Sequence, residues 1–144
     1  IRYGKLDATH EEIVKASRTV CADEFISKMP DRYQTEVRER GSMLSQGQKQ
    51  LISFARTLLS DPAILILDEA TSSIDTRTER LVQDGISRVL HGRTSFVIAH
   101  RLSTIQKADR IFVVDDGHIV EEGNADELME KRGVYYDLCM AQAM

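Results

Sequence analysis

Apolar residues recur at helical spacing near the start of the chain. Thr9 and Glu12 have the spacing of a capping box, in which each side chain bonds the backbone N–H of the other residue. The apolar positions that follow predict a helix over residues 11–21. A second short helix is predicted over residues 25–28 and ends at Pro30.

A polar stretch at residues 30–43 has no sustained periodicity and is predicted to be a loop. From Ser45 the apolar positions again repeat every three or four residues, which predicts an amphipathic helix that ends before Asp61. No strand pattern appears in this part of the chain. Residues 1–61 are therefore predicted to form a helical subdomain.

The pattern changes after residue 62, where short continuous apolar runs replace the helical repeat. The first run, Ala63–Leu67, ends in acidic residues and is typical of a strand that is buried on both faces. Strands are predicted at residues 63–67, 94–99 and 110–114, with helices between them at 76–90 and around 104–107. Alternating strands and helices favour a parallel sheet and the α/β fold class.

The last part of the chain begins with a hairpin signal. Asp116 and Gly117 predict a tight turn, after which residues 118–120 form the returning strand. Asn124 has the position of a helix N-cap, and two short helices are predicted around Gly133. Residues 62–144 are thus predicted to form a second unit, made of the strands, the hairpin and the helices between and after them.

Composition narrows the function classes. The chain has 144 residues, of which 42% are hydrophobic and 29% charged, so it is neither a disordered nor a low-complexity sequence. The longest apolar run, Ala63–Leu67, is far too short to span a membrane. A formal net charge of −4 lacks the basic surplus of a nucleic-acid-binding protein, so no nucleic-acid partner is predicted.

Two carboxylates follow the first predicted strand. Asp68 and Glu69 lie at its carboxyl end, which is where parallel α/β sheets bind ligands. Adjacent residues of a strand point in opposite directions, so the two acids would have different roles. In phosphate chemistry, one would hold Mg²⁺ and the other would orient or deprotonate the attacking water. The alternative is a strand that ends in solvated acids.

Two other features are candidates for phosphate contacts. Ser45 begins a predicted helix and Gly47 follows it closely, so free backbone N–H groups would face an anion at the positive end of the helix dipole. Ser45 is equally explained as an ordinary N-cap. His100 comes directly after the second strand, where a histidine can contact a phosphate, although a lone histidine is more often structural.

The order of these motifs resembles the ATPase domain of ABC transporters, and of exporters in particular. Leu-Ser-Gln-Gly-Gln at 44–48 is followed by Ile-Leu-Ile-Leu-Asp-Glu-Ala at 64–70, Ser-Ser-Ile-Asp at 72–75 and Ile-Ala-His-Arg at 98–101. The segment at 35–41 is similar to the one that contacts the loops of the membrane domain in exporters. The resemblance covers essentially the whole chain.

The resemblance implies a role for each matching residue. In the family, the signature motif binds the γ-phosphate of ATP held by the opposite subunit, and here it comprises Leu44, Ser45, Gln46, Gly47 and Gln48. Ser45 would contact the phosphate by its hydroxyl and Gly47 by its backbone N–H. The remaining assignments are Asp68 as the Walker B acid that supports Mg²⁺, Glu69 as the general base, Asp75 as the D-loop acid and His100 as the switch histidine.

The sequence departs from the family pattern in three respects. Gln46 and Arg38 stand where glycine is more usual. No Gly-x-x-x-x-Gly-Lys-[Ser/Thr] loop, which cradles the β- and γ-phosphates, occurs in these residues. In the family, the strand that leads to this loop lies between the one before the switch histidine and the one that matches residues 110–114. The chain is therefore expected to be the later portion of an ATPase domain, inactive by itself, with unpaired strand edges through which it would self-associate.

The implied partners are a membrane domain, a second ATP-binding domain and the rest of its own domain, at the cytoplasmic face of a membrane. ATP and Mg²⁺ are the implied cofactors of the intact domain, whose core is of the P-loop, RecA-like type. Two alternatives remain: a non-catalytic dimerisation or regulatory fragment, and a lobe of an ABC-type DNA-repair or chromosome ATPase.

Overall fold

The computed structural model describes residues 1–37, 41–68, 76–98 and 102–142. These residues form two compact units, Ile1–Val97 and Ile98–Met144, and each is described by itself. The division that the sequence predicts, at residues 61 and 62, separates functional parts of the family's domain and stays a prediction. None of the helices in the described ranges has the length and apolar character needed to cross a membrane.

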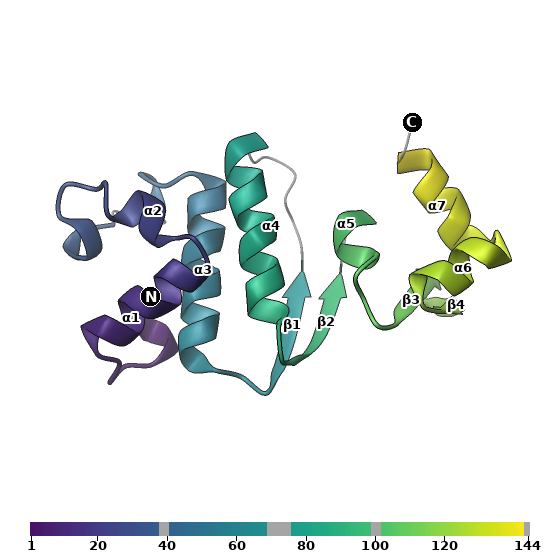
Figure 1. Ribbon diagram of the computed structural model, residues 1–144, viewed down its shortest axis with the longest axis horizontal. Coiled ribbons are helices and arrows are strands. Elements are labelled where there is room, and N and C mark those ends of the chain that lie inside the picture. The colour runs from purple at the N-terminus through teal and green to yellow at the C-terminus, as the bar shows by residue number, and fades with distance from the viewer. Residues whose placement is uncertain (38–40, 69–75, 99–101, 143–144) are drawn as a thin grey trace. The chain divides into compact units, whose positions relative to one another are not determined.

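The first unit begins with helices, as predicted (Figure 1). They are the 3₁₀ turn η1 (Arg2–Gly4), α1 (His10–Thr19), α2 (Asp23–Ile26), the 3₁₀ turn η2 (Arg32–Gln34) and α3 (Gln46–Ser60). The capping box predicted at α1 is present: the Thr9 side chain accepts from the Glu12 N–H, and the Glu12 carboxylate accepts from the Thr9 N–H. Asp61, in the left-handed conformation, ends α3.

The unit continues with β1 (Ile64–Asp68), α4 (Thr76–Leu90) and β2 (Thr94–Ile98). The two strands pair in one small sheet, and Figure 1 shows both arrows pointing the same way, so the strands are parallel, as the α/β pattern predicts. Gly92, at φ 74°, makes the turn between α4 and β2. An ion pair of 2.6 Å joins Arg93, at the start of β2, to Asp61, at the end of α3.

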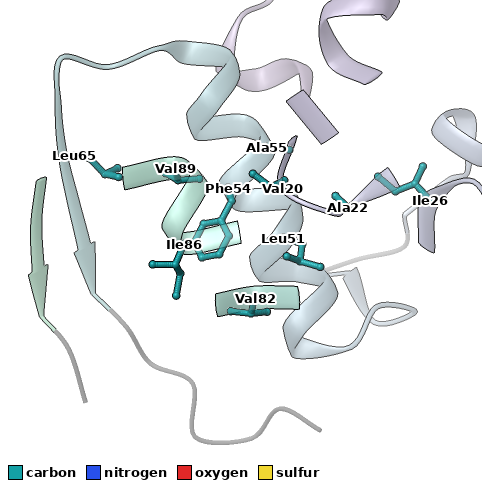
Figure 2. Packing of buried hydrophobic residues seen from close by; sticks show 10 residues of the cluster. All are labelled: Val20, Ala22, Ile26, Leu51, Phe54, Ala55, Leu65, Val82, Ile86 and Val89. Atoms are coloured by element: carbon teal, nitrogen blue, oxygen red, sulfur yellow. The ribbon is translucent and has the colours of Figure 1, made fainter. Parts of the chain in front are cut away.

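A single apolar cluster holds the first unit together (Figure 2). Leu51, Phe54 and Ala55 of α3 meet the buried face of α4. At this crossing lies Gly85, where a Cβ atom would stand only 3.1 Å from the Phe54 ring and 3.3 Å from Leu51. The close approach of the two helices therefore depends on a glycine. The other buried members of the cluster are Val20, Ala22, Ile26, Leu65, Val82, Ile86 and Val89.

The strands of this unit are covered on one face only, which differs from the prediction that the first strand is buried on both. Leu65 is 8% exposed and packs in the cluster, whereas Ile64 and Ile66 are 61% and 74% exposed. In β2, Phe96 and Ile98 are likewise exposed. Within this unit, α3 and α4 supply a layer for one face of the sheet and no described element covers the other.

The second unit contains α5 (Leu102–Ile105), β3 (Ile111–Asp115), β4 (His118–Gly123), α6 (Ala125–Lys131) and α7 (Val134–Gln142). The hairpin turn has positive φ at both Asp116 and Gly117, as a primed two-residue turn requires. Asn124 caps α6 in a capping box with Glu127. The predicted hairpin and the two final helices are confirmed.

One expectation about the sheet is wrong for the described residues. The third predicted strand was expected to join the parallel sheet, but β3 pairs antiparallel with β4 in a separate sheet. The resemblance offers a physical reason, since it implies that another strand lies between the second and third ones, and residues for that strand are not found in this sequence. Ile111 and Val113 pack against α6 and α7, whereas Phe112 and Val114 are exposed.

The start of α7 is fixed by a side chain from the hairpin. The two carboxylate oxygens of Glu121 accept from the N–H groups of Val134 and Tyr135, at 2.8 and 2.9 Å. A Cβ atom at Gly133 would collide with this carboxylate. The glycine in the short connection between α6 and α7 is therefore required by the contact that begins the last helix.

Candidate functional site

The signature residues lie at the beginning of α3. Leu44 is buried at 8% exposure, while Ser45 and Gln46 are exposed and Gly47 is buried. Gln48 completes the first turn of the helix. The predicted residues 44–48 are thus brought together by a single local element.

A capping box organises this helix terminus. The Ser45 Oγ accepts from the Gln48 N–H at 3.2 Å, and the Gln48 Oε1 accepts from the Ser45 N–H at 3.0 Å. Because Oγ uses only a lone pair in the cap, its own proton remains available to a phosphate oxygen. The first N–H groups of an α-helix have no acceptor within the helix, so those of Gln46 and Gly47 also face outward at the positive end of the dipole.

Gln46, which replaces the more usual glycine, fits the backbone found here. It is the first residue of α3 and is exposed, so its side chain neither enters the helix packing nor requires a left-handed conformation. The donors that could meet a phosphate are a hydroxyl and backbone N–H groups, and the substitution leaves each of them in place.

Asp68 is the last residue of β1 and is exposed. α3 is followed directly by β1, which runs back beside it, so the start of α3 and the end of β1 point toward the same end of the first unit (Figure 1). A carboxylate is the kind of ligand that Mg²⁺ prefers. No group of three or more candidate metal ligands occurs among the described residues.

The other three predicted site residues lie outside the described residues. They are Glu69, Asp75 and His100, and their roles stay predictions. Of the residues that the resemblance assigns, the structure therefore describes the signature residues and Asp68.

A second feature of the first unit, a pocket, was not predicted from the sequence. η1, η2 and α3 border a pocket of about 410 Å³ whose lining includes Tyr3, Arg32, Thr35, Lys49 and Arg56. These residues come from separate elements, so no single motif contains them. One signal was readable, because Lys49 and Arg56 are seven residues apart on a predicted helix and must share a face.

The comparisons with known proteins agree with the motif order. The family model described as "ABC transporter" matches residues 5–72. The ABC transporter ATP-binding protein YknV of Bacillus subtilis (strain 168) is 60% identical over 142 residues. The match covers 99% of this chain and 24% of that protein, so the chain spans about a quarter of the relative's length.

A relative named for a transport function is also similar. The fatty acid ABC transporter ATP-binding/permease protein of Mycobacterium bovis is 53% identical over 141 residues, covering 98% of this chain and 22% of that protein. Among solved structures, a bacterial Atm1-family ABC exporter with ATP bound matches with a TM-score of 0.86 and 42% identity. That match covers 99% of this chain and 25% of the exporter's chain. The chain therefore belongs to the ABC transporter family, as a portion of the ATP-binding domain of its exporter-like members.

Proposed function

We propose that this chain is the part of an ABC exporter that binds the γ-phosphate of ATP through its signature motif. It would also supply the two carboxylates that support Mg²⁺ and activate the attacking water during ATP hydrolysis. The observation that carries the proposal is the terminus of α3, where a hydroxyl proton and two backbone N–H groups remain free to donate. The likeness to an exporter with ATP bound, over 99% of this chain, supports the same assignment.

The signature residues would act by holding charge. Ser45 would donate its hydroxyl proton to a phosphate oxygen while its lone pair keeps the Gln48 N–H capped. The N–H of Gly47 would add a second donor, and the helix dipole favours the negative phosphate. These donors are fixed before ATP arrives, so little reorganisation is needed when charge develops.

The strand-end residues would complete the chemistry. Mg²⁺, when bound with ATP, would neutralise phosphate charge and be supported by Asp68 at the end of β1. Glu69 would take a proton from the attacking water, and His100 would contact the γ-phosphate. Asp75 would lie at the interface with a second ATP-binding domain.

The whole protein would couple this hydrolysis to transport across a membrane. Its partners would be a membrane domain, a second ATP-binding domain and the remainder of its own ATP-binding domain, at the cytoplasmic face of a membrane. The segment at residues 35–41 would contact the membrane domain. Two observations support a larger assembly: the chain spans about a quarter of its relatives' length, and one face of the β1–β2 sheet is uncovered and apolar.

Glu69→Gln in the whole transporter tests the proposal. The variant should bind MgATP as the unmodified protein does and lose most of its turnover, because the amide cannot accept the proton. Nucleotide binding and phosphate release should be measured on the same preparation. Normal turnover in this variant would exclude Glu69 as the base.

The 144-residue chain provides a separate test. Because it contains no phosphate-binding loop, it should bind MgATP weakly and should not hydrolyse it. Tight binding in a calorimetric titration would contradict this. A chain that carries its relatives' preceding segment as well is the matched positive control.

A further inference from the structure

A capping box is often accompanied by a second contact, the hydrophobic staple. The staple packs the residue before the N-cap, called N′, against the residue four positions after the N-cap, called N4, and so fixes the angle at which the chain enters the helix. Three described helices begin with a capping box, and their N4 residues are Ile13 in α1, Lys49 in α3 and Leu128 in α6. Ile13 and Leu128 are buried apolar side chains. Of these three helices, only the signature helix α3 has a charged residue at N4.

The aliphatic stem of Lys49 nevertheless occupies the place of an apolar staple residue. Leu44, the N′ residue of α3, is 8% exposed. A Cβ atom at Gly41 would stand 3.7 Å from Leu44 Cδ1, 3.2 Å from Lys49 Cε and 3.8 Å from Lys49 Cγ. The Lys49 stem and the Leu44 side chain therefore both lie over Gly41.

The turn that leads into Ser45 depends on this packing. Gly41 has φ 64°, a left-handed conformation that glycine adopts without strain, and its carbonyl accepts from the Leu44 N–H at 2.9 Å. Any side chain at position 41 would press on the Lys49 stem. The turn, Leu44 and the Lys49 stem thus form one packed unit directly before the signature serine.

The charge of Lys49 is not what holds its side chain in this position. Lys49 is half-buried, and within the ranges that the structure describes its ammonium forms no ion pair or hydrogen bond. A lysine can pack its stem on apolar surface while its ammonium stays in water. The part of Lys49 that makes contacts is therefore the stem.

We propose that Lys49 is a positioning residue for the signature motif: its stem, packed beside Leu44 on Gly41, fixes the direction in which Ser45 presents its hydroxyl to the γ-phosphate. The proposal rests on the proposed function, which makes Ser45 a phosphate contact, and adds a residue outside the five signature positions. The capping box decides which groups of the terminus are bonded, whereas the staple sets the entry angle. That angle matters because a donor misplaced by about 1 Å can slow a reaction about a hundredfold.

Steady-state ATP hydrolysis by the whole transporter tests this with a pair of variants. Lys49→Ala removes the stem and should lower kcat about tenfold while changing KM for MgATP less than about twofold, because misplaced donors weaken the transition state more than ground-state binding. Lys49→Met keeps an unbranched apolar stem without the charge and should retain kcat within about twofold. Lys15, exposed on α1, is the matched control, and Lys15→Ala should hydrolyse ATP as the unmodified protein does.

Hydrogen exchange gives a readout that is independent of turnover. In Lys49→Ala, a peptide covering residues 44–52 should exchange at least about threefold faster, because the entry of the chain into α3 is no longer held. Lys49→Met should exchange at the unmodified rate. Gly41→Ala is the second variant: its Cβ would press on Lys49 Cε, so it should show the faster exchange and the lower kcat with Lys49 itself unchanged.

A normal kcat or unchanged exchange in Lys49→Ala would overturn the proposal. So would a Lys49→Met variant as slow as Lys49→Ala, because the charge and not the stem would then matter. If Lys49→Ala does not fold, Gly41→Ala is judged by the same two measurements. Ser45→Ala is assayed first: normal turnover in that variant would overturn the proposed function, while the exchange of residues 44–52 would still report on the Lys49 stem.

Discussion

α3 and β1 are consecutive in the chain, and they differ in how much of their apolar surface the described residues bury. α3 has one apolar face that is buried against α4, and its first turn is closed by its own Ser45 and Gln48. β1 is apolar on both faces, yet only Leu65 is buried and Ile66 is 74% exposed. The helix terminus that carries the signature residues is therefore built locally, whereas the strand that ends at Asp68 needs further protein around it.

A pair of truncations should give the largest contrast between these elements. Phe54→Ala removes a ring that is 4% exposed at the α3–α4 contact and should lower the free energy of unfolding by about 3–5 kcal/mol. Ile66→Ala removes an exposed side chain and should change it by less than about 0.5 kcal/mol. Denaturant unfolding of both variants would check this. Comparable losses would show that the outer face of β1 is covered in solution.

Self-association should depend on the outer face of the sheet. Replacing both Ile66 and Phe96 with threonine removes apolar surface that is 74% and 58% exposed. The dissociation constant for self-association should rise by about tenfold, which corresponds to a loss of about 1.4 kcal/mol of association free energy. Sedimentation over a concentration series would measure it. Val97→Thr is not a suitable control because it can alter the packed face, so Val114→Thr, on the other sheet, should be used.

The capping box at α3 should make a smaller, local contribution. Ser45→Ala and Gln48→Ala should each cost about 1 kcal/mol, because each removes one of the two reciprocal hydrogen bonds of the box. Combined, they should cost less than the sum, because losing one bond loosens the helix terminus that the other bond holds. Gln48→Glu retains an acceptor for the Ser45 N–H and should be nearly neutral. Thermal unfolding of the four variants would test this. Additive losses would mean that the two side chains act independently.

The smallest effect should come from Tyr33, beside the helices that precede α3. Burial, followed by the 2.7 Å hydrogen bond that its hydroxyl donates to Asp23, raises the pKa of Tyr33 to about 12 from 10.0. The protonated phenol therefore stabilises the fold fully below pH 10, and this contribution is lost as the pH rises through 12.

Tyr33→Phe should flatten part of the alkaline fall in stability between pH 10 and 12. Unfolding curves at several pH values would measure it, with Tyr3→Phe as the control because Tyr3 is 84% exposed. An unchanged slope in the Tyr33 variant would show that its titration does not contribute.

The helices and turns were predictable because their signals are local. Thr9, Ser45 and Asn124 each cap a helix in a box with the residue three positions on, and Asp116-Gly117 makes the predicted turn. The family was equally readable, because its motifs depend on residue types in a fixed order. Burial on both faces of the first strand was not confirmed. An apolar run indicates that its side chains favour burial, but it does not indicate which segment covers them.

The pocket could not be predicted in the same way. Its cations lie on η2 and α3, and its walls depend on how closely Gly4 approaches the Arg56 carbonyl. The sequence contains the i, i+7 pair on α3 but gives no measure of that approach.

By itself, the sequence determined the α/β class, the presence and order of the main helices and the family, because each follows from residue types and their spacing along the chain. The phosphate roles of the signature and strand-end residues stay predictions. Only the tertiary structure decided which face of β1 is covered, that β3 pairs with β4 in a sheet of their own, and that three cations share one pocket. These depend on packing between elements far apart in the chain, and packing is set by shape and contact rather than by local preference.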